Sequence, residues 1–409
     1  AFSLARAESL LQRKRAKIES NLMNNPSLYP CLSPQLHIVQ EQLTSVQQYH
    51  VETLSLKAGI RWREQGELSA RYLKRTASAR LIKTTIPPLF CPTLERVCVS
   101  KDEMLDAAFV FYDNLFAPDP IGLNAEDSLL EAIPQSYVLF ADDSSLLTDS
   151  ISFDKIVEAF SRCPKQGSPG LDGLPYSIVR LIVLHPDCKN IVVQVYNDAL
   201  KFGVFPPSWL STSVCLLPKK GDLSDLRNWR SISLINTDAK VFTRILNSRF
   251  LMVTDQMINP YQSGFVRGRF IADNGLLMKL LMEHVGTSNS SAIALLLDQE
   301  KAYDRVHPLY LQLVLEKFGF PSAIVHSITS LFFSTQLSLN INRSHSALVL
   351  QRGGLRQGDS LSPILFNLAF EPLLRSILCH TSISGLTLPA PLTPASCLGS
   401  GSFQTAASV

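Results

Sequence analysis

The residue best suited to metal chemistry is a carboxylate that directly follows an apolar run. Residues 292–297 have the length and composition of a buried strand, and Asp298 comes next, ahead of a predicted helix start at Ala302. A strand that ends in an acid places that acid at a sheet edge, where metal ions and ligands bind. Carboxylate oxygens are ligands that Mg²⁺ prefers. The alternative is an Asp that caps the following helix, and this segment by itself leaves both interpretations open.

A second candidate is the glycine loop, residues 353–361, which leads into a predicted helix. Arg356 and Gln357 lie among its glycines, and glycine lets the backbone approach a ligand closely. Ser362 and Pro363 then predict a helix start, with Ser362 as the N-cap residue. A polar loop at a helix start suits a nucleotide or a template strand. An ordinary turn before a core helix is the alternative.

Three further segments have side chains or turns that suit a triphosphate or a nucleic acid. The basic hairpin, LLPKKGD followed by NWRSISLI, has Lys219, Lys220 and Arg230 around a Gly-Asp turn, and such cations bind phosphates. The sequence QSGFVRGR places Arg267 and Arg269 beside an aromatic residue, which fits a nucleic-acid strand. The third segment is the sharp loop SPGLDGLP. For each segment alone, a solvated surface turn is the alternative.

The composition restricts the class of protein. The chain has 409 residues, of which 46% are hydrophobic and 18% are charged, so we expect a globular protein of two or three domains. No apolar run approaches the roughly 20 residues of a membrane-spanning helix. The eight Cys form no CxxC pair, which argues against a zinc site or a disulfide scaffold. No signal peptide is evident, and we expect an intracellular protein.

The charge is unevenly distributed along the chain. Residues 1–85 have 13 Lys/Arg against 6 Asp/Glu, residues 86–155 have 3 against 13, and no charged residue follows position 375. A basic arm beside an acidic stretch is compatible with a nucleic-acid partner, although a surface fluctuation explains the pattern nearly as well.

The apolar pattern predicts an α+β fold. The first 85 residues are mostly helical, with interruptions at Pro26, Pro30 and Pro34. After residue 153, helices alternate with short apolar strands. These strands are predicted at residues 214–217, 292–297 and 347–350.

In this order, the segments resemble the reverse transcriptases of LINE-type non-LTR retrotransposons. The resemblance covers about residues 153–378 and rests on SPGLDGLP, LLPKKGD, NWRSISLIN, QSGFVRGR, LDQEKAYDRV and GLRQGDSLSPILFNL. It implies a right-hand polymerase with fingers and a partial palm. The predicted organisation is a basic helical extension (1–85), an acidic loop-rich connector (86–150), fingers (151–290), a partial palm (291–378) and an uncharged, disordered tail (379–409).

The resemblance also implies site roles and partners. Asp298 would be the catalytic metal ligand of motif A (residues 292–306), and the backbone carbonyl of Gln299 would hold a second Mg²⁺. Tyr303 would lie under the incoming sugar and exclude a 2′-hydroxyl. Nucleotide contacts would come from Lys219, Lys220, Arg230, Gln357 and Gly358, and nucleic-acid contacts from Arg267, Arg269 and Arg356. The partners implied are an RNA template, a DNA primer and dNTPs, joined by attack of the primer 3′-hydroxyl on the α-phosphate at two Mg²⁺ ions. A nuclear location is implied in the same way.

Two-metal chemistry needs further carboxylates, which the family supplies from a (Phe/Tyr)-Ala-Asp-Asp hairpin after the glycine loop. No Asp or Glu follows Glu371. The same letters occur upstream, where Asp142 and Asp143 would complete the site only in a permuted palm; an acidic turn is the alternative. We therefore expect a polymerase fragment that is weakly active or inactive. The alternatives are a nucleic-acid-binding remnant without chemistry and a remnant that does not fold. The uncharged tail from Ser376 also fits a lost reading frame.

Overall fold

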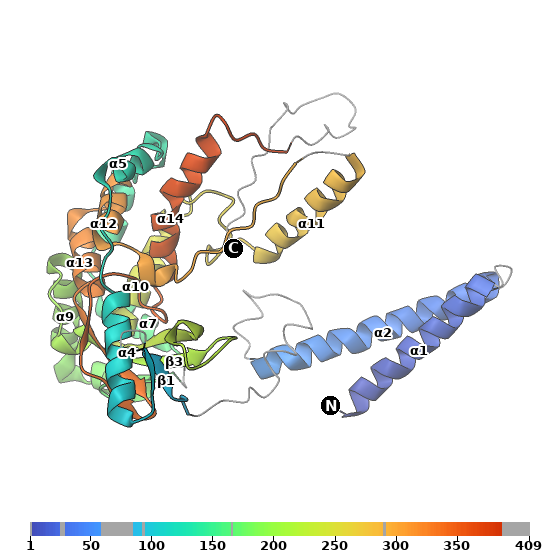
Figure 1. Cartoon of the computed structure of the whole chain (residues 1–409), viewed down its shortest axis with the longest axis horizontal. Coiled ribbons are helices and arrows are strands. Elements are labelled where there is room, and N and C mark those ends of the chain that lie inside the picture. Colours follow the sequence, from blue (N-terminus) through green and yellow to red (C-terminus); the bar gives the residue numbers. More distant parts are fainter. Residues whose placement is uncertain are drawn as a thin grey trace. The chain divides into compact units, whose positions relative to one another are not determined.

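The structure is a computed structural model that describes residues 2–24, 29–58, 85–91, 95–164, 167–288 and 292–386 (Figure 1). The chain divides into two compact units. The first comprises Ala1–Lys83 and Phe270–Leu280, and the second comprises Thr84–Arg269 and Leu281–Val409.

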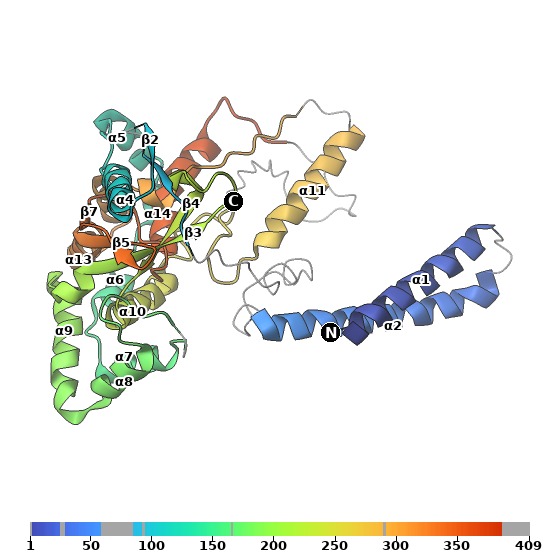
Figure 2. The same ribbon diagram turned by 60° about the horizontal axis from the view of Figure 1, so that its bottom comes forward.

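The first unit contains a pair of long helices, α1 (Phe2–Asn24) and α2 (Tyr29–Ala58), which lie side by side (Figure 2). The buried apolar residues of this pair include Ile18, Val39 and Leu43. The predicted helical character of the extension is confirmed, but the predicted breaks at Pro30 and Pro34 are wrong, because both lie within α2. Pro30 lies in the first turn, where backbone N–H groups have no intrahelical partner, whereas Pro34 lies farther inside and lacks the N–H that would bond to the Pro30 carbonyl. Residues 59–84, which belong to the predicted helical extension (1–85), lie outside the described residues.

Helix α11 (Ile271–Ser288) begins in the first unit and ends in the second. The apolar side chains of α11 do not form a clear stripe along one face, and none of its residues is buried. Leu276, Leu280 and Met282 are all more than half exposed. The described residues therefore provide no core for this helix.

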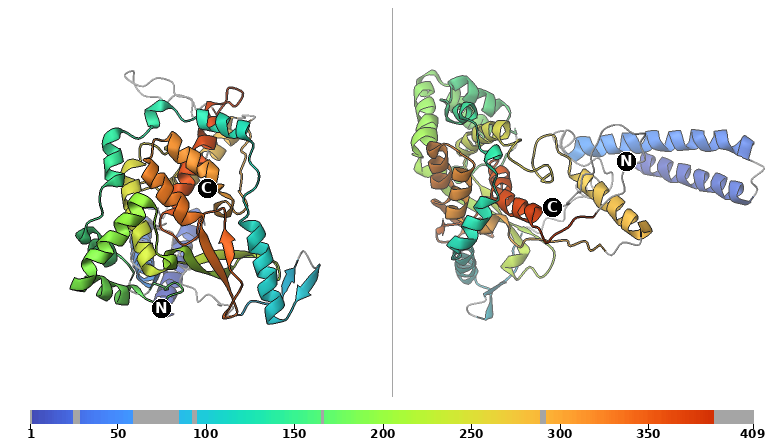
Figure 3. Two further views of the ribbon diagram at one scale, coloured as in Figure 1. Left: turned by 90° about the vertical axis from the view of Figure 1, so that its left-hand side faces the viewer. Right: turned by 90° about the horizontal axis from the view of Figure 1, so that it is seen from above.

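The second unit is built on a five-stranded mixed sheet (Figure 3). Its strand order is β4 (Trp229–Leu234), β3 (Ser211–Pro218), β5 (Thr335–Ile341) and β6 (Ser344–His345), and β7 (Val349–Gln351) also pairs with β5. Strands β3 and β5 are parallel, and the other pairs are antiparallel. The strands predicted at 214–217 and 347–350 are confirmed in β3 and β7. The sheet combines strands from the ranges 151–290 and 291–378, so it crosses the predicted boundary near residue 290.

The strand predicted at residues 292–297 is wrong for this structure. Residues 292–299 are irregular and exposed, and Ile293 and Leu296 are 92% and 75% exposed. A strand needs a neighbouring strand to pair its backbone N–H and C=O groups. Among the described residues, no strand pairs with this segment.

Helices form the larger core of the second unit. Buried side chains of several of them belong to one continuous cluster, which includes no residue of the sheet strands. The helices are α7 (Phe153–Ser161), α8 (Tyr176–Leu184), α9 (Lys189–Phe202), α10 (Thr237–Val253), α12 (Pro308–Lys317), α13 (Ser322–Phe332) and α14 (Ser362–Cys379). Short 3₁₀ turns occur at Gln135–Tyr137, Pro186–Cys188, Pro207–Leu210, Leu226–Asn228 and Tyr303–Arg305.

The predicted loop-rich connector, residues 86–150, is instead largely regular structure. It forms the hairpin β1 (Leu89–Cys91) and β2 (Arg96–Cys98), then α4 (Lys101–Leu115), α5 (Leu123–Glu131) and α6 (Ala141–Thr148). Several of its acids lie in first helical turns, where the helix dipole favours negative charge. Ser100 and Glu103 form a capping box that starts α4. Helix α4 packs against β5 and β7 and contributes to a second core cluster.

Helix α14 is long and apolar enough to cross a membrane by length and composition. However, 56% of its residues are buried in the second unit, where it packs against α5, α10 and α12. We therefore assign it as a core helix. The predicted N-cap is shifted by one residue, because the helix begins at Ser362 and Leu361 occupies the cap position. The Ser362 hydroxyl donates to the Arg356 carbonyl at 2.7 Å.

Candidate functional site

The basic hairpin is the two-stranded ribbon of β3 and β4. Arg230 pairs with Leu217 in the register of these strands, and both side chains are exposed on the same face. Lys219 follows the end of β3, and its N–H donates to the Asn228 carbonyl at 2.8 Å. Lys219 and Lys220 are also exposed. The hairpin therefore displays three cations at one end of the sheet, as predicted from the sequence.

The glycine loop lies against the side of β4 next to these cations. The Ser233 N–H donates to the Gln357 carbonyl at 2.7 Å. At Gly358, where φ is 107°, a Cβ atom would lie 3.0 Å from the Ser233 carbonyl and 3.6 Å from the Ile232 side chain. Ile232 shares a face with Arg230 and lies about 7 Å from it along the strand. The structure thus places the predicted nucleotide-binding loop next to the predicted phosphate-binding cations.

The second half of motif A is joined to the same loop through its backbone. The Leu355 N–H donates to the Tyr303 carbonyl, and the Gly354 N–H donates to the Val306 carbonyl, both at 2.8 Å. A Cβ atom at Gly354, where φ is 79°, would lie only 2.7 Å from the Asp304 carbonyl. Glycine is required at this position because both the positive φ and the close approach exclude a side chain.

Asp304 lies at the centre of this junction, and the sequence reasoning assigned it no role. Its side chain is buried and accepts from Gln357 Nε2, at 3.3 Å to Oδ1 and 3.4 Å to Oδ2. Burial raises the pKa of the Asp304 carboxyl, while Lys301, the Gln357 hydrogen bond and Lys219 act in the opposite direction. The only signal in the sequence was its place in LDQEKAYDRV. A hydrogen-bond partner 53 residues away could not be read from that motif.

Two side chains beside Asp304 are held by aromatic rings. Tyr303 stacks on Phe366 of α14 with ring centroids 5.0 Å apart, and burial raises the pKa of its phenol to about 12. Lys301 Nζ lies 4.6 Å from the Phe111 ring centroid, and burial lowers the pKa of its ammonium group. The Tyr303 ring is therefore neutral and fixed at neutral pH. Its predicted position under the incoming sugar stays a prediction.

Two ion pairs connect the acidic region, residues 86–150, to motif A and to the residue before the glycine loop. Arg305 Nη1 lies 2.6 Å from Asp119 Oδ2, and Arg352 Nη2 lies 2.9 Å from Asp113 Oδ1. These exposed ion pairs each contribute little stability. They show, however, that the predicted connector contacts the turn of motif A and Arg352, which lies between β7 and the glycine loop.

The predicted metal site is not formed by the described residues. Asp298 and Gln299 belong to the exposed irregular segment. Asp142 and Asp143 lie in the first turn of α6, where Gln256 Nε2 donates to Asp143 Oδ2 at 3.2 Å. Within the described ranges, no three His, Cys, Asp or Glu side chains gather where a metal ion could bind. Among the described residues, neither a donor set for two Mg²⁺ ions nor the carboxylate cluster of a permuted palm is therefore formed.

Two of the arginines predicted to contact nucleic acid are held within the protein itself. Arg356 is fully buried, with its Cζ 4.5 Å from the Phe332 ring centroid and its Nη2 3.5 Å from Asp359 Oδ2. Burial lowers the pKa of its guanidinium group. A buried Arg inside a glycine-rich motif is not distinguishable from an exposed one by residue type and spacing.

The guanidinium group of Arg269 is also occupied by the protein itself. It donates to four backbone carbonyls, those of Asp255, Ile258, Asn259 and Gln262. These bonds hold the turns before the QSGFVRGR loop. Arg267 in the same loop is exposed, and its contact with nucleic acid stays a prediction.

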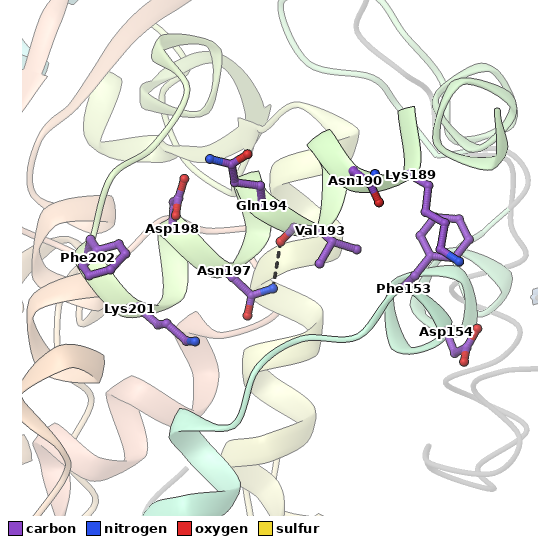
Figure 4. A pocket seen from close by; sticks show the side chains of 10 residues that line it. All are labelled: Phe153, Asp154, Lys189, Asn190, Val193, Gln194, Asn197, Asp198, Lys201 and Phe202. Atoms are coloured by element: carbon purple, nitrogen blue, oxygen red, sulfur yellow. Dashed lines mark hydrogen bonds between the residues drawn. The ribbon is translucent and has the colours of Figure 1, made fainter. Parts of the chain in front are cut away.

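An open groove lies on the helical side of the second unit, between α7 and α9 (Figure 4). Its lining includes Lys189, whose Nζ lies 5.1 Å from the Phe153 ring centroid, and Lys201. Asn197 Nδ2 donates to the Val193 carbonyl at 2.8 Å, as Figure 4 shows. None of the predicted site residues lines this groove. It is therefore separate from the cluster around Asp304.

Comparison with known proteins gives matches over the part of the chain that contains the basic hairpin, motif A and the glycine loop. Residues 217–387 match the reverse transcriptase (RNA-dependent DNA polymerase) family. The chain is 36% identical over 288 residues to the Transposon TX1 uncharacterized 149 kDa protein of Xenopus laevis, covering 70% of this chain and 21% of that protein. It is 28% identical over 222 residues to the Pol polyprotein from the type-1 retrotransposable element R2 of Popillia japonica, covering 54% and 30%. It is 29% identical over 219 residues to that of element R2DM of Drosophila melanogaster, covering 53% and 20%.

The mixed helix-and-sheet fold and the family match define a reverse transcriptase segment. Its relatives are proteins of non-LTR elements, and the chain belongs with the LINE-type reverse transcriptases. The resemblance seen in the sequence is thus confirmed. The chain spans between a fifth and a third of the length of these relatives.

Proposed function

We propose that this chain is the polymerase segment of an RNA-directed DNA polymerase, which extends a DNA primer on an RNA template with dNTPs. One observation carries the proposal. The turn of motif A, the glycine loop and the basic hairpin are joined by hydrogen bonds into one cluster around Asp304. Residue types that suit a nucleotide therefore converge from three distant parts of the sequence.

Each part of this cluster has a proposed task. Lys219 and Arg230 bind the triphosphate, because charge-assisted hydrogen bonds from cations to phosphate are strong; Lys220 contributes long-range attraction. The glycine loop approaches the nucleotide through Gln357 and Gly358. A Cβ atom at Gly358 would lie only 3.0 Å from the Ser233 carbonyl. Tyr303 presents a flat, neutral ring to the sugar. Arg267 contacts the backbone of the template or primer.

The proposed reaction is attack of the primer 3′-hydroxyl on the α-phosphate of the dNTP, which releases pyrophosphate. In related enzymes divalent metal ions promote such transfers. Asp298 and the Gln299 carbonyl are the proposed ligands from this chain. Because the described residues do not complete such a site, we assign substrate binding to them and no metal-dependent step. We further propose an intracellular, nuclear location for this activity.

A second function is supported by a specific observation. Asp298 is exposed and has no partner acids within the described part of the chain. A segment that binds an RNA–DNA duplex and a nucleotide without joining them would have this arrangement. The two functions differ only in chemistry, and one experiment separates them.

The experiment measures primer extension and duplex binding by residues 1–409 on poly(rA)/oligo(dT) with Mg²⁺ and dTTP. Incorporation that is lost in Asp298→Ala and kept in Glu300→Ala, a neighbouring exposed acid, would support polymerase activity of this chain alone. Further loss in Asp142→Asn/Asp143→Asn would show that the upstream acids complete the site. Binding without incorporation would support the second function. A folded chain that binds neither the duplex nor dTTP would contradict both.

A further inference from the structure

The buried carboxylate of Asp304 contacts Gln357, one of the residues proposed to contact the nucleotide. We propose that Asp304 is a positioning residue, which turns the Gln357 side-chain amide so that its carbonyl oxygen, Oε1, accepts a hydrogen bond from the bound nucleotide. This inference rests on the proposed function, because it names what one residue of that site recognises.

The orientation follows from the chemistry of the two groups. An ionised carboxylate only accepts hydrogen bonds, whereas a glutamine amide has a donor end and an acceptor end. Gln357 Nε2 donates toward both Asp304 oxygens, at 3.3 and 3.4 Å. Burial raises the pKa of the Asp304 carboxyl, while Lys301, the Gln357 hydrogen bond and Lys219 act in the opposite direction and favour the ionised form. With its donor end engaged, Gln357 has its acceptor end left for a ligand.

Asp304 itself cannot move away from this contact. Its side chain is 7% exposed. On either side of it, the carbonyls of Tyr303 and Val306 accept main-chain hydrogen bonds from the glycine loop, which fix the backbone. The Gln357 backbone is fixed independently by Ser233. The contact between Asp304 and Gln357 therefore determines only the direction of the amide.

The acceptor end of Gln357 is available to a ligand. The Gln357 side chain is partly exposed. Within the described part of the chain, the hydrogen bonds of this amide run through Nε2 to Asp304, and no residue donates to Oε1. Lys219, at the end of the basic hairpin, is near enough to act on Asp304. A nucleotide whose phosphates meet that hairpin would thus bring its sugar or base to Oε1.

An acceptor at this position selects the kind of group it meets. Oε1 would attract a sugar hydroxyl or an N–H group of the base, and it would repel phosphate oxygens, which are acceptors too. Gln357 is therefore assigned to the sugar or base of the nucleotide, and the triphosphate is left to Lys219 and Arg230. Residue type alone does not predict this assignment, because a glutamine side chain can also donate to phosphate.

The test is a double-mutant cycle on nucleotide affinity. We would measure binding of dTTP to the full 409-residue chain on poly(rA)/oligo(dT), in Asp304→Asn, Gln357→Met and the double variant. Asn at 304 has a donor as well as an acceptor, so the amide of Gln357 is free to turn over. A lost hydrogen bond predicts about threefold to tenfold weaker dTTP binding in Asp304→Asn. In the Gln357→Met background, the same change should have less than about a twofold effect. Asp119→Asn, an exposed acid near the same turn, is the matched control and should bind normally.

Each outcome decides one point. An equal loss from Asp304→Asn in both backgrounds would overturn the positioning role and leave a structural one. Unchanged binding in Asp304→Asn would overturn it too, while the proposed function stands. A folded wild-type chain that binds no dTTP on the duplex would overturn the proposed function itself.

A second variant covers the case in which Asp304→Asn does not fold. Gln357→Glu keeps an acceptor but faces Asp304 with a second carboxylate, in an environment that also contains Lys301, Lys219, Arg305 and Tyr112. We expect weak dTTP binding at pH 8 that recovers at pH 5.5, where the two carboxyls share a proton. Binding that does not change with pH would contradict the proposal.

Discussion

The glycine loop is proposed to contact the nucleotide and the first half of motif A to hold metal ions, and the two segments differ in how firmly the structure fixes them. The loop is fixed from two sides, by Ser233 of β4 and by the backbone of Tyr303 and Val306. Residues 292–299 are irregular and exposed, and Ile293 is 92% exposed. The boundary between fixed and exposed backbone lies within motif A, because its second half is hydrogen-bonded to the glycine loop. A loop is fixed by a few specific hydrogen bonds, but a strand requires a complete neighbouring strand.

The largest effect is expected from removing the close approach between the two motifs. Gly354→Ala should destabilise the second unit by about 3 kcal/mol or more, because its φ of 79° is unfavourable for alanine and its Cβ would lie 2.7 Å from the Asp304 carbonyl. Gly264→Ala, where no atom lies within 4 Å of the added Cβ, is the control. Urea unfolding measures both, and similar stabilities would show that the junction is not rigid.

A smaller contrast is expected between two leucines. Leu365 of α14 is fully buried, and Leu296 is 75% exposed. Leu365→Ala should cost about 2–5 kcal/mol through lost contacts and a cavity, whereas Leu296→Ala should change stability by less than about 0.5 kcal/mol. Chemical denaturation of the two variants tests this directly. A comparable cost at both positions would mean that residues 292–297 are packed in solution.

The smallest effect concerns the pH dependence of stability. Burial raises the pKa of the Asp304 carboxyl in the folded state, so the folded state binds protons more tightly than the unfolded state. The free energy of unfolding should therefore fall as pH rises from the unfolded value near 4 through the raised pKa. Asp304→Asn should flatten this part of the profile. Thermal unfolding of both proteins at several pH values measures the slopes, and parallel slopes in the wild type and the variant would contradict this prediction.

Local patterns in the sequence predicted the parts that are held by local interactions. The hairpin around Lys219 and Arg230 and the helix after Ser362 were predicted from turn residues and apolar spacing. Strand β5 was not, because its burial depends on parallel pairing with β3, far away in the sequence. The acidic region 86–150 was taken for loops, although the capping pair Ser100 and Glu103 marked the start of α4.

Within the candidate site, the sequence predicted which residues lie close together better than which residues are exposed. Lys219 and Gln357 were both predicted, and the structure brings both to Asp304. Arg356 was predicted as a surface contact, but it is buried over Phe332. The apolar run before Asp298 has the composition of a strand, but residues 292–299 are irregular in the structure. Whether such a run becomes a strand depends on a partner strand, which composition does not reveal.

Hydrogen exchange of backbone amides tests the contrast between the two regions most directly. In the full chain under native conditions, the amides of Ser233 and Leu355, which donate to Gln357 and Tyr303, should be strongly protected. The amides of residues 293–298 should exchange at nearly the rate of an unstructured peptide. Protection of residues 293–298 equal to that of Leu355 would contradict the account, because it would show that this segment already has a strand partner.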